Sequence, residues 1–395
     1  MNDVASGDGV NKNYYFDNAA TSWPKPENVY KAADNQMRNM FGNPGRSGHT
    51  RTLEADRLIY KTRAAIGRFF NIDDPARIAF TLNATDALNM ALKGYLKQGD
   101  LVLHTAMDHN SVLRPLSRLS KENFITMTTI PCSEEGYPSL DFLESALKRK
   151  SSLLVINHAS NVTGTIAPLH EMVNLAHSYG AAVLVDAAQT AGSIPIDAGT
   201  LGIDMLAFTG HKGLLGPTGT GGLYIRPGLE IKSMREGGTG SQSELDTHPE
   251  DMPERLEAGT LNSAGLAGLF EGVTYIMETG LDKIRKHEQN LRFYLCNKLA
   301  EFPGIKLYGP PAEQHCACIV SITIDHVDSG EIGYILENNY SILCRTGLHC
   351  APLAHQAIGS FPAGTIRFSP GPFSTTEDID YLINALQEII TLVRR

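Results

Sequence analysis

Two residues of opposite charge follow two predicted strands and indicate the chemistry available to this chain. Asp186 ends the run 182–185, and Lys212 closes the segment Thr209-Gly210-His211-Lys212 after the run 205–208. Both runs are typical of buried parallel strands, whose carboxyl ends meet at the ligand-binding edge of an open α/β sheet. A lysine amine there can form a Schiff base with pyridoxal phosphate, while a carboxylate keeps the pyridine nitrogen protonated. A solvated loop lysine and a helix-capping aspartate would explain the same two residues more simply.

A helix start upstream could hold the phosphate of such a cofactor. The strand expected at 78–81 leads through Leu82-Asn83-Ala84 into a helix that begins near Thr85. Backbone N–H groups at this start and the Thr85 hydroxyl would cradle a phosphate. Thr209 offers a second hydroxyl beside the lysine. Taken alone, Thr85 is equally explained as a helix cap.

Three further polar residues follow strand ends that should face the same edge of the sheet. His109 lies in the turn Met107-Asp108-His109-Asn110, where it could stack on a planar ring or move a proton. Asn161 and Gln189 are placed to hydrogen-bond a ligand. The simpler explanation for each is a loop side chain that serves only the fold.

A cysteine in the C-terminal part of the chain is a candidate nucleophile. Cys350 follows Arg345-Thr346-Gly347 and is next to His349, before an expected short helix. A helix N-terminus and a neighbouring histidine favour the thiolate, which is the nucleophilic form. A buried structural cysteine is the common alternative. A metal site made of Cys344, His349, Cys350 and His355 is disfavoured because the paired C-x₂-C spacing is missing.

Arg367 alternates with apolar neighbours on an expected strand, 365–368. Its guanidinium either reaches solvent on one face or meets an anion, and its fork geometry suits a substrate carboxylate.

The elements that position these residues alternate between strand and helix. This alternation predicts an α/β fold with a mostly parallel central sheet flanked by helices. From about residue 281 the pattern changes to that of a smaller α+β domain. We therefore expect an N-terminal segment, 1–26, packed on the small domain, a large domain at 27–280 and a small domain at 281–395. The strands are expected at 78–81, 101–104, 124–130, 153–157, 182–185, 205–208, 223–226, 316–324, 342–344 and 365–368.

Composition limits the class of protein. The chain has 395 residues, 19% charged and 42% hydrophobic, and a net charge of −9 with no block of lysine and arginine. This argues against a nucleic-acid or anionic-membrane surface. Residues 1–13 lack an apolar signal-peptide core and are expected to be loosely attached. Six scattered cysteines do not form a disulfide framework, so a reducing cytoplasm is expected.

Four motifs in order resemble the class V aminotransferase superfamily and, within it, the cysteine desulfurase and selenocysteine lyase family. They are Val185-Asp186-Ala187-Ala188-Gln189, Thr209-Gly210-His211-Lys212, Arg255-Leu256-Glu257-Ala258-Gly259-Thr260 and Arg345-Thr346-Gly347 with Cys350. The resemblance runs from Tyr15-Phe16-Asp17-Asn18-Ala19-Ala20 to Arg367. It implies a dimeric fold-type-I enzyme with pyridoxal phosphate bound between the large and small domains.

The resemblance also implies a role for each matched residue. Lys212 resembles the Schiff-base lysine, Asp186 the partner of the pyridinium nitrogen and His109 the histidine stacked on the ring. Cys350 resembles the nucleophile that becomes a persulfide. The other cofactor-binding matches are Gln189, Ala84, Thr85, Thr209, His211 and, from the neighbouring subunit, Thr260; the substrate-binding matches are Asn161, Arg367, Arg345 and Ala20.

The implied reaction converts L-cysteine to L-alanine and leaves its sulfur on Cys350. Arg345-Thr346-Gly347 is expected to lie in a short loop, and this short loop resembles the SUF-type branch of the family, with two departures near the cysteine. Leu348 stands where that branch has the first of two histidines, and the loop 236–253 is shorter than its projecting hairpin. These departures bear on the sulfur acceptor, whose identity stays open. The alternatives are a selenocysteine lyase using L-selenocysteine, another enzyme of this fold such as a C–S lyase, transaminase or epimerase, and a non-catalytic carrier or regulatory protein.

Overall fold

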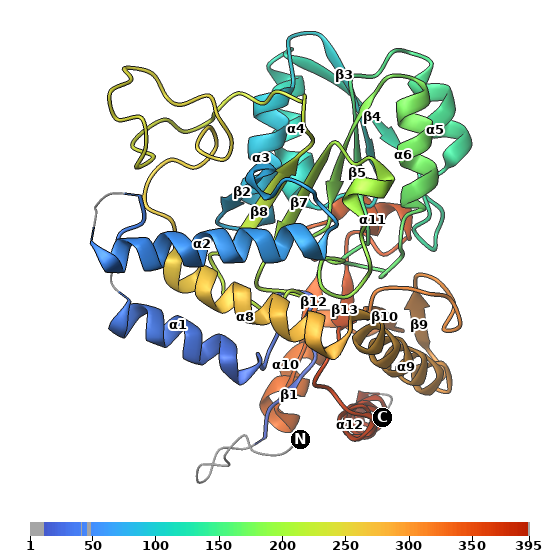
Figure 1. Cartoon of the computed structure of the whole chain (residues 1–395). Coiled ribbons are helices and arrows are strands. Elements are labelled where there is room, and N and C mark those ends of the chain that lie inside the picture. The colour runs from blue at the N-terminus through green and yellow to red at the C-terminus, as the bar shows by residue number, and fades with distance from the viewer. Residues whose placement is uncertain (1–11, 41, 46–48, 394–395) are drawn as a thin grey trace.

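A seven-stranded sheet forms the centre of the computed structural model, which describes residues 12–40, 42–45 and 49–393 (Figure 1). Its strand order is β2-β8-β7-β6-β5-β3-β4. All strands but β8 run in one direction, so the sheet is mostly parallel as predicted. The strands are β2 (Ile78–Thr81), β3 (Asp100–Thr105), β4 (Ile125–Ile130), β5 (Leu153–Asn157), β6 (Ala182–Asp186), β7 (Met205–Thr209) and β8 (Gly221–Ile225).

Both faces of this sheet are covered by helices, which explains the unbroken apolar runs of its strands. Along β5, Leu154 and Ile156 face one layer while Leu153 and Val155 face the other. The first layer contains α2 (Thr50–Phe69), α5 (Leu140–Leu147), α6 (Leu169–Ser178) and α8 (Ser263–Thr279), and the second contains α3 (Ala84–Tyr95) and α4 (Asn110–Lys121). Helix α1 (Glu27–Asn39) packs outside α8, and two single turns, η1 (Pro75–Arg77) and α7 (Ala198–Leu201), complete this part of the chain.

The C-terminal part forms a smaller α+β unit, as predicted. Its antiparallel sheet has the order β12-β13-β10-β9 and packs on three long helices. The strands are β9 (Ile305–Tyr308), β10 (Val320–Ile324), β12 (Arg345–Gly347) and β13 (Thr365–Phe368), with β11 (Ile342–Leu343) outside this sheet. The helices are α9 (Leu281–Ala300), α10 (Ser329–Tyr340), α11 (Pro352–Ala357) and α12 (Thr376–Val393).

The N-terminal strand β1 (Tyr14–Tyr15) pairs in parallel with β11, and Phe16 lies in the core of the smaller unit. The expectation of a loosely attached N-terminus falls outside the described residues for 1–11. Lys12, which is described, is ion-paired with Asp378 at 2.8 Å. The proposed boundaries after residues 26 and 280 stay predictions.

Two segments of the smaller unit differ from expectation. The strand predicted from residue 316 begins only at Val320, because Ala317 hydrogen-bonds to the Gly164 carbonyl of the large unit instead of a neighbouring strand. The loop predicted at Arg345–Gly347 is an edge strand, in which Arg345 pairs with Arg367 of β13. This pairing depends on a partner about twenty residues away, which local sequence patterns do not reveal. In the described part of the chain no helix is long and apolar enough to cross a membrane.

The long segment between β8 and α8 has no regular structure but is anchored by Glu257 of the third motif. Glu257 forms a two-pronged ion pair with Arg63 of α2 at 2.7 and 2.9 Å, and both side chains are less than a tenth exposed. Glu257 also accepts the Phe80 N–H of β2 at 2.6 Å. The carboxylate therefore holds the end of this segment, and with it Thr260, against the sheet.

We expect Glu257→Gln to lower the free energy of unfolding by about 3–5 kcal/mol, because the buried Arg63 would lose its counter-charge. Denaturant unfolding followed by circular dichroism measures this. Glu122→Gln, which breaks the exposed pair with Arg118, is the control and should leave the unfolding transition unchanged. Equal transitions for the two variants would contradict the anchoring role.

Candidate active site

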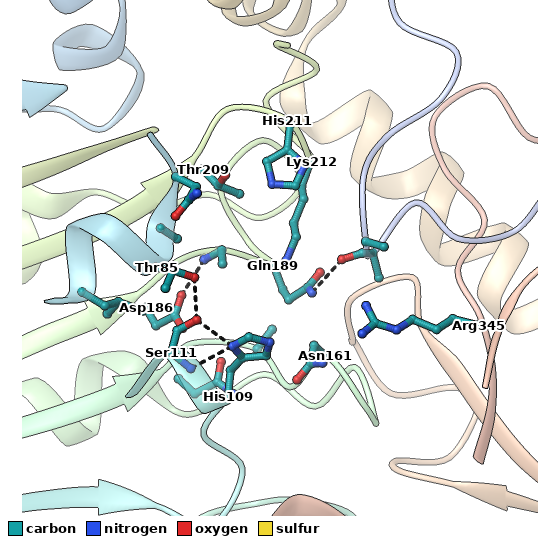
Figure 2. A pocket seen from close by; sticks show the side chains of 18 of the residues that line it. Thr85, His109, Ser111, Asn161, Asp186, Gln189, Thr209, His211, Lys212 and Arg345 are labelled. Carbon is teal, nitrogen blue, oxygen red and sulfur yellow. Dashed lines mark hydrogen bonds between the residues drawn. The ribbon is translucent and has the colours of Figure 1, made fainter. Parts of the chain in front are cut away.

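A cavity of about 230 Å³ lies where the carboxyl ends of the central strands meet the smaller unit (Figure 2). It collects side chains from both parts of the chain, including most of the residues singled out from the sequence. Those residues are Ala20, Ala84, Thr85, His109, Asn161, Asp186, Gln189, Thr209, His211, Lys212, Arg345 and Arg367. Thr260 and Cys350 do not line it. Asn83, Ser111, Asn157 and Ala188 line it without having been predicted as site residues.

Asp186 and Lys212 meet in this cavity, as their positions after two adjacent parallel strands predict. Asp186 ends β6, is 4% exposed, and accepts the Ala188 N–H at 2.9 Å. Burial raises the pKa of Asp186 to about 6, although the Ala188 hydrogen bond and the charge of Lys212 act in the opposite direction. A cationic N–H beside Asp186 would favour its ionised form further.

The Lys212 side chain extends into the cavity from the loop after β7 (Figure 2). Desolvation lowers the pKa of Lys212 to about 8, against the opposing effect of Asp186, and the nearby cations Arg367 and Arg345 add to the lowering. A useful fraction of neutral amine is therefore present near neutral pH, which is what a lysine needs to attack an aldehyde.

Unpaired polar atoms at one end of the cavity fit a phosphate. Among the described residues, Thr209 Oγ1 and His211 Nδ1 are buried without a hydrogen-bond partner. The N–H groups of Ala84 and Thr85, at the first turn of α3, have no acceptor inside the helix. Hydroxyl, imidazole and helix N–H donors thus converge where an anion is favoured.

His109 is held in one protonation state by the start of α4. Its Nδ1 accepts the Ser111 N–H at 3.1 Å and lies 2.8 Å from Ser111 Oγ, so Nε2 carries the proton. Burial, reinforced by the charge of Lys212, lowers the pKa of His109 to about 4. The neutral ring has one N–H left for a ligand. Ser111 also hydrogen-bonds Thr85 at 2.7 Å. This bond connects the part of the cavity beside His109 with the part that fits a phosphate.

Arg367 and Asn161 lie at the opposite end of the cavity. Arg367 on β13 is fully buried and donates from Nη1 to the Asn161 carbonyl at 3.0 Å and from Nη2 to Asp17 at 2.7 Å. The Asn161 side chain donates to the His349 carbonyl at 2.7 Å. Arg367 Nε and Asn161 Oδ1 are buried without partners in the described part of the chain. An unpaired donor on a guanidinium fits a carboxylate.

Cys350 lies just outside the cavity and is connected to it by Arg345. The Arg345 guanidinium lines the cavity and donates to Cys350 Sγ at 3.4 Å. Residues 348–351 form a tight turn in which His349 and Cys350 have φ of 46° and 59°, and the Leu348 carbonyl accepts the Ala351 N–H at 2.8 Å. The turn directs Cys350 to the surface while burying His349.

The expectation that His349 assists the thiol is wrong for this geometry. His349 is 2% exposed and shares a hydrogen bond of 2.9 Å with Thr365, and desolvation lowers its pKa to about 2, so it carries no charge. The cationic neighbour of the thiol is Arg345 instead. The described ranges contain no group of three or more histidine, cysteine, aspartate or glutamate side chains suited to a metal.

Three residues that stabilise this site are not predicted as site residues from the sequence. The Asp17 carboxylate binds Arg367, and the Ser111 N–H binds His109. The Glu257 carboxylate binds Arg63. Asp17 and Glu257 belong to quoted motifs, which is the signal that could have found them. Ser111 carried only the weak signal of a serine next to a helix start.

Comparison with known proteins identifies the family. Residues 14–382 match the aminotransferase class-V family, and the chain belongs to it. Cysteine desulfurases are among its relatives in this family. It is 32% identical to a probable cysteine desulfurase of Methanothermobacter thermautotrophicus, over 96% of this chain and 95% of that protein. It is 34% identical to a cysteine desulfurase of Escherichia coli, over 96% of this chain and 94% of that protein.

Solved structures give the same grouping. A cysteine desulfurase from Thermococcus onnurineus superposes with a TM-score of 0.90 and 32% identity, covering 95% of this chain and 94% of that one. A cysteine desulfurase of Escherichia coli superposes with a TM-score of 0.87 and 28% identity, covering 96% and 95%. The predicted fold class and the predicted family are confirmed.

Proposed function

We propose that this chain is a pyridoxal-phosphate-dependent cysteine desulfurase that converts L-cysteine to L-alanine and keeps the sulfur on Cys350. The observation that carries the proposal is the joint placement of Lys212 and Asp186 in one cavity, with Cys350 held at its edge by Arg345. Full-length similarity to cysteine desulfurases supports the same reaction.

The residues present fit the cofactor. Lys212 would hold it covalently, Asp186 would pair with its ring nitrogen, and His109 would lie against the ring. Gln189 would bond its phenolic oxygen, and the phosphate would be held by Ala84, Thr85, Thr209 and His211. When bound, pyridoxal phosphate supplies an electron sink for bonds at the substrate Cα and Cβ.

The substrate would be held by its carboxylate. Arg367 offers an unpaired guanidinium N–H for the carboxylate, and Asn161, Ala20 and Arg345 line the same cavity. Arg367 would bind the carboxylate through its free Nε. This places the amino group toward Lys212 and leaves the substrate sulfur on the side of Cys350.

The side chains of the protein would then carry out the following steps. Lys212 Nζ removes the proton from the substrate Cα. The Cys350 thiolate attacks the substrate sulfur, so that an S–S bond forms as the Cβ–S bond breaks and its electron pair remains with the carbon. Protonation of that carbon and return of a proton to Cα give alanine, and Cys350 is left as a persulfide. Arg345, which already donates to Sγ, would orient the Cys350 sulfur at the edge of the cavity.

Three finer statements belong to the same proposal. The enzyme would act as a homodimer. Thr260 is exposed and does not line the cavity of its own subunit. Apolar side chains are also exposed on helices α1 and α2, namely Tyr30, Met37, Leu53 and Tyr60. Light scattering tests this. It would work in the cytoplasm, where its six free cysteines stay reduced. A sulfur-acceptor protein would take the persulfide, in iron–sulfur cluster assembly or a related use.

Selenocysteine is the competing substrate, because none of the described residues that line the cavity distinguishes sulfur from selenium. Incubating the holoenzyme with L-cysteine and with L-selenocysteine, and measuring alanine from each, tests the proposal directly. Alanine from cysteine is the expected result. Alanine only from selenocysteine, or pyruvate or a racemised amino acid as product, would favour the lyase or the other reactions of the fold.

Loading of the cofactor should depend on pH through Lys212. Because desolvation brings the pKa of Lys212 to about 8, the neutral amine becomes abundant as pH rises toward that value. We expect the rate at which the apoenzyme takes up pyridoxal phosphate covalently to rise roughly tenfold per pH unit below 8 and to level off above it. Stopped-flow absorbance measures the rate. A rate that does not change between pH 6.5 and about 8 would contradict the lowered pKa.

A further inference from the structure

The carboxylate of Asp17 occupies one side of the guanidinium that would receive the substrate. Asp17 Oδ1 accepts from Arg367 Nη2 at 2.7 Å, and the Arg367 side chain is 1% exposed while that of Asp17 is 22% exposed. Arg367 Nη1 is also used, by the Asn161 carbonyl. Of the guanidinium nitrogens, Nε is the one buried without a partner in the described ranges.

Backbone hydrogen bonds fix the main chain on both sides of Asp17. The Phe16 carbonyl accepts the Ser369 N–H at 2.7 Å, and the Asp17 carbonyl accepts the Ala20 N–H at 3.0 Å, so a tight turn joins strand β1 to the cavity. The same turn leads to Ala20, which lines the cavity. The backbone of Asp17 is therefore fixed beside Arg367.

The charged side chains around the cavity show why the position of the Asp17 carboxylate affects ligand binding. Lys212, Arg345 and Arg367 are cationic, and Asp186 and Asp17 are their anionic neighbours. Asp186 is assigned to the cofactor ring, so Asp17 is the anion that balances the guanidinium. A substrate or product carboxylate that binds Arg367 must come close to a second carboxylate on the same group.

We propose that Asp17 lowers the affinity of the site for amino-acid carboxylates, because its negative charge repels a carboxylate that is bound to Arg367. Before substrate binds, Asp17 balances the charge of the buried guanidinium and orients it. Once the carboxylate of alanine is bound, repulsion from Asp17 weakens its binding and favours release of the product. The proposal rests on the proposed role of Arg367 as carboxylate ligand, and it makes Asp17 a positioning residue with a second, electrostatic effect.

The test compares two ligands that differ only in the carboxylate. L-Alanine and ethylamine are titrated into the holoenzyme and into its Asp17→Asn variant, with calorimetry as the readout. Asparagine keeps an oxygen acceptor for Arg367 and removes the charge. We expect the variant to bind L-alanine at least about fivefold more tightly, since two unit charges about 4 Å apart repel by about this factor even at the dielectric constant of water. Ethylamine binding should be unchanged.

Kinetics and a matched control complete the test. The KM for L-cysteine should fall in Asp17→Asn while kcat stays equal or falls, because product leaves more slowly. Asp141→Asn, at an exposed position of α5, removes the same charge outside the cavity and should bind both ligands as the wild type does.

Weaker or unchanged alanine binding in Asp17→Asn would overturn the proposal, since it would mean that Asp17 only orients Arg367. An equal change for ethylamine would also overturn it. Failure of the wild-type holoenzyme to bind L-alanine at all would instead count against the proposed function.

Discussion

Replacement of Lys212 by alanine is expected to remove covalent cofactor binding and to reduce alanine formation by at least ~10²–10⁴-fold, the usual contribution of a positioned acid–base group alone. The physical reason is that Lys212 is assigned two tasks, attachment of pyridoxal phosphate and transfer of the Cα proton. No second lysine lines the cavity in the described part of the chain, so no other amine can replace it. Visible absorption of the purified variant and an alanine assay measure the two losses.

Lys93→Ala, on the exposed surface of α3, is the matched control and should keep both properties of the wild type. If Lys212→Ala still carried covalently bound cofactor, the assignment of the lysine would be wrong. A variant that lost the cofactor but made alanine at the wild-type rate would contradict the whole reaction scheme.

Replacement of Cys350 by alanine separates cofactor chemistry from sulfur transfer. We expect Cys350→Ala to bind pyridoxal phosphate as the wild type does, because Cys350 is not among the described residues that line the cavity. Alanine formation from L-cysteine should fall by about 10³-fold or more, as when a catalytic nucleophile is removed. The variant should retain an intact cofactor spectrum, which a misfolded protein would not.

Cys132→Ala is the control for this experiment, since Cys132 is also a free and partly exposed thiol but is not connected to the cavity through Arg345. It should make alanine at the wild-type rate. If Cys350→Ala were equally active, the sulfur would leave by another route, and a C–S lyase reaction would become the better description.

The large sheet could be predicted from the sequence because its strands are buried on both faces. Apolar runs such as Leu153–Asn157 are read reliably when helices alternate with them, and parallel topology then brings their carboxyl ends together. For this reason Asp186 and Lys212 were correctly expected in one site. Their shared position follows from strand direction and requires no knowledge of side-chain contacts.

The contacts between distant segments could not be predicted in this way. The local sequence predicts a loop at Arg345, whereas the strand that contains it exists only through pairing with β13. The ion pair of Asp17 with Arg367 joins residues 350 positions apart, and no local periodicity encodes it. His349 was expected to assist Cys350 because the two are adjacent in sequence. The turn directs them to opposite sides, so that Arg345 takes the place beside the thiol.

In the proposed reaction Lys212 and Asp186 bind the cofactor, and Cys350 accepts the sulfur of the substrate. A single turnover with L-cysteine, without reductant or acceptor, followed by mass spectrometry of the intact chain and its peptides, tests this claim most directly. We predict one alanine per active site and the mass of one added sulfur atom on the peptide that contains Cys350. Alanine formed with Cys350 unmodified, or the added sulfur found on another cysteine, would contradict it.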